Sequence, residues 1–182
     1  KNEKKFQLIT YVCDNCWLVQ TKDVASKKIF FNNHYPYFSS TSSSWLQHAK
    51  NYVTKITKKL KLNKKSLVIE LASNDGYLLQ YFKMKKIPCL GIEPSKNTSL
   101  IAKKKGIKSL DKFFSYDLAK RIKNKADLII GNNVYAHVPN LNDFTKGIKT
   151  LLKKDGTITL EFPHLLNLIK YSQFDTIYHE HF

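Results

Sequence analysis

The stretch Leu67-Val-Ile-Glu-Leu-Ala-Ser-Asn-Asp-Gly76 decides the fold of this chain, and the amphipathic run Tyr77-Leu-Leu-Gln-Tyr-Phe82 follows it directly. An apolar run that ends in small and polar residues predicts a buried strand, a tight turn and a helix opening behind the turn. The turn has Ala72, Asn74 and Gly76 where glycines would alternate in a glycine-rich loop, and Asn tolerates the left-handed backbone region. We expect such a turn to present free backbone N–H groups and a positive helix end to a ligand above the strand.

A second apolar run, Cys89-Leu-Gly-Ile92, ends in Glu93-Pro94. An acidic side chain at the end of this strand is placed to accept hydrogen bonds from ribose hydroxyls, and the alternative is a solvated strand-end carboxylate. Phe113 and Phe114 follow a third predicted strand, where an adenine ring would lie, although ordinary core aromatics explain them equally well. The turn and Glu93 together predict a nucleoside-cofactor site.

Apolar and amphipathic runs alternate along most of the chain. Strands are predicted at 67–73, 89–93, 108–111, 127–132 and 157–162, and helices at 76–86, 96–105, 115–124 and 141–153. Gly106 and Gly156 are placed to end helices. This order predicts an α/β fold with a Rossmann-like, doubly wound parallel sheet that lacks its last strands.

The region before this alternation has a different character. Residues 1–41 are irregular and rich in Lys and Asn, with an aromatic loop towards their end. The run Ser39-Ser-Thr-Ser-Ser-Ser44 can cap a helix whose apolar positions extend from Trp45 to Leu60. We therefore expect two parts, a small N-terminal region of residues 1–41 and an α/β domain of residues 42–182.

The composition of the 182 residues is that of a globular protein, with 42% hydrophobic and 13% aromatic residues. The formal charge of +17 comes almost wholly from lysine, with Arg121 the one arginine, whereas nucleic-acid recognition relies on arginine forks. We expect no nucleic-acid partner, and an anionic small substrate remains compatible with the charge. No apolar run approaches a membrane span and no leader opens the chain, so we expect a cytoplasmic protein without a membrane partner. The oligomeric state is left open.

Three cysteines provide no disulfide framework. Cys13 and Cys16 are separated by two residues, a spacing that lets both thiolates bind one zinc ion. One such pair is half of a tetrahedral site, and the alternative is two unrelated thiols in a turn. The chain begins at Lys1 without a methionine, so we expect it to be a piece of a longer protein with a second pair upstream.

Polar residues follow the fourth predicted strand, at the edge where open α/β sheets bind ligands. Asn132 and Asn133 can hold the amino-acid part of a cofactor or the substrate, and His137 can donate to a substrate oxygen. A structural histidine is the alternative for His137. The segment is not Asn/Asp-Pro-Pro-aromatic, which argues against methylation of amino groups on bases.

The end of the chain gathers titratable side chains. Glu161-Phe-Pro-His164 is followed by Asp175-Thr-Ile-Tyr-His-Glu-His-Phe182. Tyr178, Glu180 and His181 indicate an acid–base cluster or a metal site, although the spacing is not the His-Glu-x-x-His of a zinc helix. Buried polar groups without a chemical role are the third possibility.

These motifs together resemble the S-adenosylmethionine-dependent sugar C-methyltransferases, which methylate nucleotide-linked deoxysugars. The resemblance covers nearly the whole chain, and it rests on the following motifs: the Cys13–Cys16 pair, Tyr35-Pro-Tyr-Phe-Ser-Ser40, Ser44-Trp-Leu-Gln-His-Ala49, Glu70-Leu-Ala-Ser-Asn-Asp-Gly-Tyr-Leu-Leu79, Gly91-Ile-Glu-Pro94, Gly131-Asn-Asn-Val134, Ala136-His-Val-Pro139, Glu161-Phe-Pro-His-Leu-Leu166 and Asp175-Thr-Ile-Tyr-His-Glu-His-Phe182. It implies a zinc-binding N-terminal domain, a Rossmann-like methyltransferase domain and truncation at both ends.

The resemblance also implies roles for individual residues. It assigns cofactor binding to Glu70, Ala72, Asn74, Gly76, Glu93, Pro94, Phe113 and Asn132, and substrate binding to Tyr35, Tyr37, Asn133 and His164. His181 with Tyr178 is implied as the base, Glu180 orients the sugar and His137 contacts its keto oxygen. The implied reaction removes a proton beside a ketone and methylates the resulting enolate. Two alternatives remain open at this stage, a methyltransferase with another acceptor such as RNA, and a non-catalytic fragment.

Overall fold

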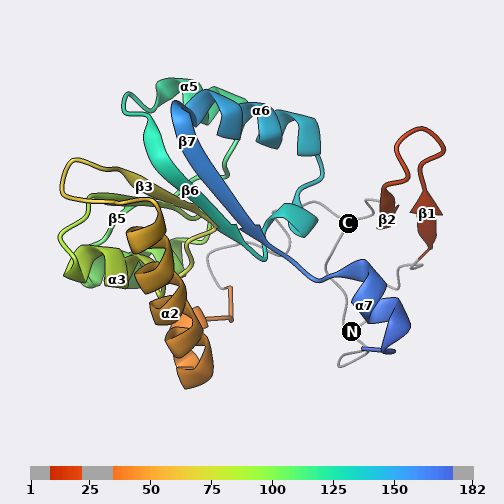
Figure 1. Cartoon of the computed structure of the whole chain (residues 1–182), viewed down its shortest axis with the longest axis horizontal. Helices are drawn as coiled ribbons and strands as arrows, with labels where there is room; N and C mark the ends of the chain where they lie inside the picture. Colours follow the sequence, from red (N-terminus) through yellow and green to blue (C-terminus); the bar gives the residue numbers. More distant parts are fainter. Residues whose placement is uncertain (1–8, 22–34, 174–182) are drawn as a thin grey trace, which may run out of the picture.

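A computed structural model describes residues 9–21 and 35–173, and its main feature is a parallel five-stranded sheet (Figure 1). The spatial order of the strands is β5-β4-β3-β6-β7. Their bounds are β3 (Val68–Leu71), β4 (Cys89–Ile92), β5 (Lys108–Leu110), β6 (Ala126–Asn132) and β7 (Leu152–Glu161). The order reverses between β3 and β6, which is the switch point where such sheets bind ligands.

Helices cover both faces of the sheet (Figure 1). One apolar core packs α2 (Ser43–Lys59), α3 (Leu79–Met84) and α4 (Lys96–Lys104) on one face. The other core packs α5 (Tyr116–Arg121) and α6 (Leu141–Leu151) on the opposite face. Because the strands are buried on both faces, β3 is apolar at every position except Glu70. The predicted Rossmann-like α/β fold is confirmed.

Some predicted boundaries differ from the structure. Helix α3 begins at Leu79 rather than at residue 76, because Gly76 has φ +76° and the chain is still turning. Strand β7 begins at Leu152 rather than at 157, but its register with β6 shifts, and regular pairing begins at Thr157. Gly156 therefore lies inside β7 and does not end a helix as predicted, whereas Gly106 follows α4 with φ +72°, as expected of a glycine just beyond a helix end.

The remaining described elements are short or lie before the sheet. Strands β1 (Thr10–Val12) and β2 (Val19–Thr21) form an antiparallel pair, and η1 (Ser39–Thr41), η2 (Tyr135–His137) and α7 (Leu165–Lys170) complete the set. Helix α2 begins where the serine run predicted, since the Ser42 side chain accepts from the Trp45 N–H. No helix within residues 9–21 and 35–173 has the length and apolar character needed to cross a bilayer.

Candidate functional site

The turn after β3 lies at the switch point and has an unusual backbone. Ala72, Asn74 and Gly76 have φ values of +56°, +48° and +76°. This left-handed conformation is tolerated by Gly and Asn and is strained for Ala. The three residues predicted to replace alternating glycines therefore all take the conformation that glycine favours.

The prediction that this turn presents free backbone N–H groups is wrong for residues 72–76. The N–H groups of Ala72 and Ser73 donate to the Ile92 carbonyl, and that of Gly76 donates to the Ser73 carbonyl. The Asn74 N–H donates to Glu93, and the Asp75 N–H donates to the Asn74 side chain. The turn closes on itself and on β4, so polar side chains rather than free amides are its means of binding a ligand.

Glu93 faces the turn from the end of β4. One carboxylate oxygen accepts from the Asn74 N–H at 2.9 Å, and the other accepts from the Ser95 N–H at 2.8 Å. Burial raises the pKa of this carboxyl above its usual value, and the two backbone hydrogen bonds partly offset the rise. Pro94 follows at a half-buried position. The two parts of the predicted nucleoside site therefore lie in direct contact.

Glu70 is the most deeply buried acid beside this turn. Its side chain is 1% exposed, and neither carboxylate oxygen has a hydrogen-bond partner. Burial raises the pKa of Glu70 well above its ordinary value of 4.5, and the nearby carboxyls of Glu93 and Asp75 add to the rise, while the neighbouring Tyr77 hydroxyl, which does not reach regular hydrogen-bond geometry, opposes it. A buried carboxylate without a partner is costly, and a cationic ligand would relieve that cost.

Asn132 and Asn133 lie at the carboxyl end of β6, across the switch point from Glu70. The Asn132 side chain donates to the Tyr77 hydroxyl at 3.3 Å. Asn133 is exposed with φ +49°, and its N–H donates to the Glu161 carbonyl at 2.7 Å. His137 is half-buried in the short helix η2 that follows.

Side chains of helix α2 contact the carboxyl end of the sheet beside the turn. The sequence patterns did not predict these contacts. His48 pairs with the Glu161 carboxylate at 2.9 Å, and the Tyr52 hydroxyl hydrogen-bonds to Thr159 at 2.5 Å. The Trp45 ring lies between those of His48 and Tyr77, with ring centroids 4.9 Å and 5.9 Å away. His48 and Tyr52 are more than a hundred residues from their partners on β7, so no local pattern could have shown these two hydrogen bonds.

The aromatic loop before α2 lies against the turn of residues 72–76, which is called the cofactor turn below because cofactor binding was predicted for it. The Ser39 N–H donates to the Asn74 side-chain oxygen at 2.9 Å, and the Asn74 amide donates to the Tyr37 carbonyl at 3.1 Å. Asn97 donates to the Tyr35 carbonyl at 2.7 Å. The structure thus brings Tyr37, a predicted substrate residue, into contact with Asn74, a predicted cofactor residue, whereas Tyr35 contacts Asn97 on α4.

The other predicted residues have varied surroundings. Phe113 is half-buried after β5, whereas Phe114 packs edge-on against Phe144 in the core. His164 is exposed and caps α7 by accepting from the Asn167 N–H. Tyr178, Glu180 and His181, the predicted acid–base residues, lie outside the described residues.

The predicted zinc ligands lie between β1 and β2. Both thiols are free, and the backbone N–H groups of Asn15 and Cys16 lower the pKa of Cys13 and so favour its thiolate. Within residues 9–21 and 35–173, no three candidate metal ligands gather together. The described part of the chain therefore offers two of the four ligands of a structural zinc site.

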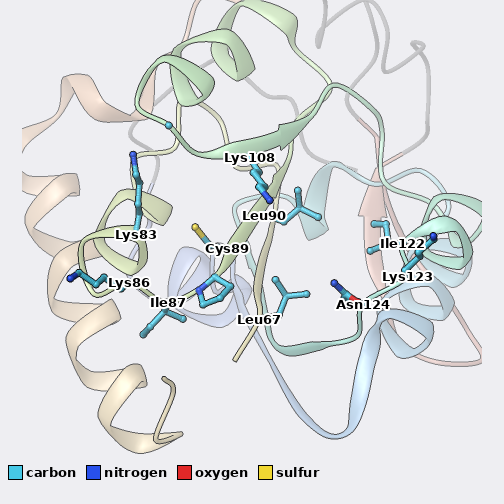
Figure 2. Close-up of a pocket in the computed structure, with 12 residues that line it drawn as sticks. Leu67, Lys83, Lys86, Ile87, Cys89, Leu90, Lys108, Ile122, Lys123 and Asn124 are labelled. Carbon is cyan, nitrogen blue, oxygen red and sulfur yellow. The ribbon is translucent and has the colours of Figure 1, made fainter. Parts of the chain in front are cut away.

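A pocket of about 490 Å³ lies at the opposite edge of the sheet (Figure 2). Leu67 precedes β3, Cys89 and Leu90 begin β4, and Lys108 begins β5, so the pocket opens at the amino ends of the strands. Ligands of open α/β sheets bind at the carboxyl ends. This pocket is therefore separate from the cofactor turn.

Comparison with known proteins identifies the family to which this chain belongs. A sequence model described as a methyltransferase domain matches residues 44–182. The chain belongs to this family. The C-methyltransferase NovU of Streptomyces niveus is 32% identical over 183 residues, which cover 99% of this chain and 43% of NovU. The chain therefore spans less than half the length of that relative. The expected resemblance to C-methyltransferases is confirmed.

Solved structures support the fold of the methyltransferase domain. An S-adenosylmethionine-dependent methyltransferase from Clostridium acetobutylicum aligns with a TM-score of 0.57 at 16% identity, over 69% of this chain and 54% of that one. One from Archaeoglobus fulgidus aligns with a TM-score of 0.57 at 14% identity, over 74% and 63% of the two chains. The chain has the fold of S-adenosylmethionine-dependent methyltransferases.

Proposed function

We propose that this protein is an S-adenosylmethionine-dependent C-methyltransferase that acts beside the ketone of a nucleotide-linked deoxysugar. Similarity to a C-methyltransferase along 99% of the chain supports the reaction. The buried, unpartnered carboxylate of Glu70 carries the cofactor assignment, because the methionine end of the cofactor has an ammonium group that would neutralise it.

The residues around the turn fit the other parts of this cofactor. Glu93 is placed at the strand end where ribose hydroxyls are bound, and it can exchange its backbone hydrogen bonds for them. The half-buried Phe113 offers an apolar surface for adenine, and Asn132, which is bonded to the Tyr77 hydroxyl, would contact the methionine end. When bound, the cofactor supplies an electrophilic methyl group.

The protein then has to generate a carbon nucleophile. A proton beside a ketone is weakly acidic, so a base must remove it while donors hold the enolate oxygen. We assign the base to His181 with Tyr178, the orienting carboxylate to Glu180 and the oxygen donor to His137, with Tyr35, Tyr37, Asn133 and His164 binding the sugar nucleotide. The proton moves to the base, and the electron pair of the broken C–H bond forms the new C–C bond to the methyl group. The pair of the broken S–CH3 bond would stay on sulfur, and S-adenosylhomocysteine would leave.

Binding of the cofactor tests the first half of this proposal. Isothermal titration with S-adenosylmethionine should give micromolar affinity, and Glu93→Ala should weaken it by about tenfold to a hundredfold, the worth of one or two hydrogen bonds to a charged group. Asp117→Ala, an exposed acid on α5, is the matched control. Equal affinities of the Glu93 variant and the control would overturn the assignment.

Proton exchange tests the second half. His181→Ala should abolish methylation of a nucleotide-linked 4-keto sugar and also the exchange of its α-proton with deuterated solvent, followed by NMR. Exchange that persists in this variant would show that another group is the base. Salt-sensitive RNA binding without binding of a nucleotide sugar would instead favour an RNA acceptor.

In the N-terminal region, we propose that Cys13 and Cys16 give two thiolates to a structural zinc ion. The lowered pKa of Cys13 and the two-residue spacing support this assignment.

A further inference from the structure

The segment from Tyr35 to Ser40, here called the strap, is attached to the cofactor turn mainly through its backbone. Asn74 contacts it twice, by accepting from the Ser39 N–H at 2.9 Å and by donating to the Tyr37 carbonyl at 3.1 Å. Asn97 donates to the Tyr35 carbonyl at 2.7 Å, and the Ser40 hydroxyl donates to the Asp75 carboxylate. Three of these bonds join the strap to the turn across 35 to 37 residues of sequence, and the bond from Asn97 joins it to α4 across 62 residues.

Asn74 stands at the centre of this attachment. Its backbone N–H is bonded to Glu93, its side chain is bonded to the strap, and only 7% of the residue is exposed. A glycine would take the φ of +48° with less strain and would keep the bond to Glu93. Within the turn, the Asn74 side-chain oxygen also accepts from the Asp75 N–H at 2.9 Å, so the side chain serves the turn through one hydrogen bond and the strap through two.

The strap also includes the two tyrosines expected to contact the acceptor. The Tyr37 backbone is fixed by Asn74, while 52% of the residue is exposed to solvent. An anchored backbone with an exposed aromatic side chain is prepared to receive a ligand, because less chain entropy is lost on binding.

We propose that Asn74 is a positioning residue for the acceptor substrate: its side chain fixes the strap, and with it Tyr35 and Tyr37, on the cofactor turn. The inference rests on the proposed function and gives the Asn74 side chain a role apart from the cofactor. Its backbone serves the cofactor through Glu93, and its amide group serves the acceptor through the strap. One turn residue thereby sets the relative position of the two ligands.

Asn74→Gly separates the two roles. It removes both strap hydrogen bonds and the bond from the Asp75 N–H within the turn, but keeps the backbone N–H that donates to Glu93. We expect the KM for the nucleotide sugar to rise by about tenfold or more, since two buried hydrogen bonds to the strap are lost, and to rise by a larger factor than the Kd for S-adenosylmethionine. Asn97→Ala removes one anchor only and should raise KM less. Asn124→Gly, at an exposed position that lines the separate pocket, is the control and should change none of these constants.

Hydrogen exchange of the Ser39 amide tests the anchor without any activity measurement. In the Asn74→Gly protein this amide should exchange at least about tenfold faster, because its acceptor is gone. Unchanged Ser39 exchange, or a cofactor Kd weakened as much as the acceptor KM, would overturn the proposal.

If the unmodified protein failed to bind S-adenosylmethionine, the proposed function would be wrong, while Ser39 exchange would still decide whether Asn74 holds the strap. If Asn74→Gly failed to fold, Asn97→Ala with unchanged exchange at Ser39 and unchanged KM would count against the strap.

Discussion

At the scale of single residues, three buried carboxylates surround the turn after β3. Glu93 and Asp75 both accept hydrogen bonds, whereas Glu70 has no partner at either oxygen. Burial and the neighbouring carboxyls disfavour ionisation of Glu70, which carries a cost in the free protein, whereas Asp75 is paired with Lys105. The cationic cofactor proposed above would convert the cost at Glu70 into binding free energy.

The cost at Glu70 predicts how stability depends on pH. The native pKa lies above the ordinary value of 4.5, so the native state holds a proton that the unfolded state releases. The contribution of Glu70 to stability is therefore most favourable below pH 4.5 and is lost as the pH rises through the native pKa.

Glu70→Gln should accordingly stabilise the ligand-free protein, and the gain should grow as the pH is raised. Urea unfolding at pH 5 and pH 8 measures the free energies, with exposed Asp155→Asn as control. The same variant should bind S-adenosylmethionine more weakly. A stability difference that is equal at both pH values would refute the role of the Glu70 charge.

At the scale of elements, the turn after β3 packs against β4 as closely as atoms allow. A Cβ on Gly91 would lie 2.3 Å from the Ser73 hydroxyl and 3.0 Å from its Cβ, and Ser73 is fully buried. The position is thus reserved for glycine by close approach rather than by backbone conformation.

Gly91→Ala should destabilise the protein by about 1–3 kcal/mol, the usual cost of overpacking, and should displace the turn. Thermal unfolding measures the loss. Adding Ser73→Gly removes the clashing atoms, so the double variant should recover stability relative to Gly91→Ala. A double variant that is no more stable than Gly91→Ala would show that the contact with Ser73 is not the cause.

Helix α2 illustrates how an element takes on a role beyond its packing. Its buried positions, Ala49, Val53 and Ile56, follow the helical period that the sequence shows. Its polar side chains His48 and Tyr52 reach partners on β7 that are 113 and 107 residues away. The same helix therefore covers one face of the sheet and closes the side of the proposed site.

At the scale of the whole molecule, the parallel sheet was predictable from the alternation of strands and helices, because parallel strands need crossover connections, whereas the order of the strands came from the structure. The starts of α3 and β7 differ from the predicted boundaries, because at both places turn residues lie next to the pattern of a regular element. Because Gly76 has a positive φ, α3 begins after it, and the shifted register at the start of β7 places Gly156 inside a strand. The prediction of free amides failed because the turn folded back onto β4, which depends on the packing of two strands.

The sequence by itself determined the parallel α/β sheet, the residues of the cofactor turn and the acid that faces it, since hydrophobic period and turn chemistry act over a few neighbouring positions. The tertiary structure alone decided that Glu70 is buried without a partner, that α2 is bonded to β7, and that the strap is bonded to Asn74. These contacts join positions 35 to more than 100 residues apart, and no local periodicity encodes such pairings.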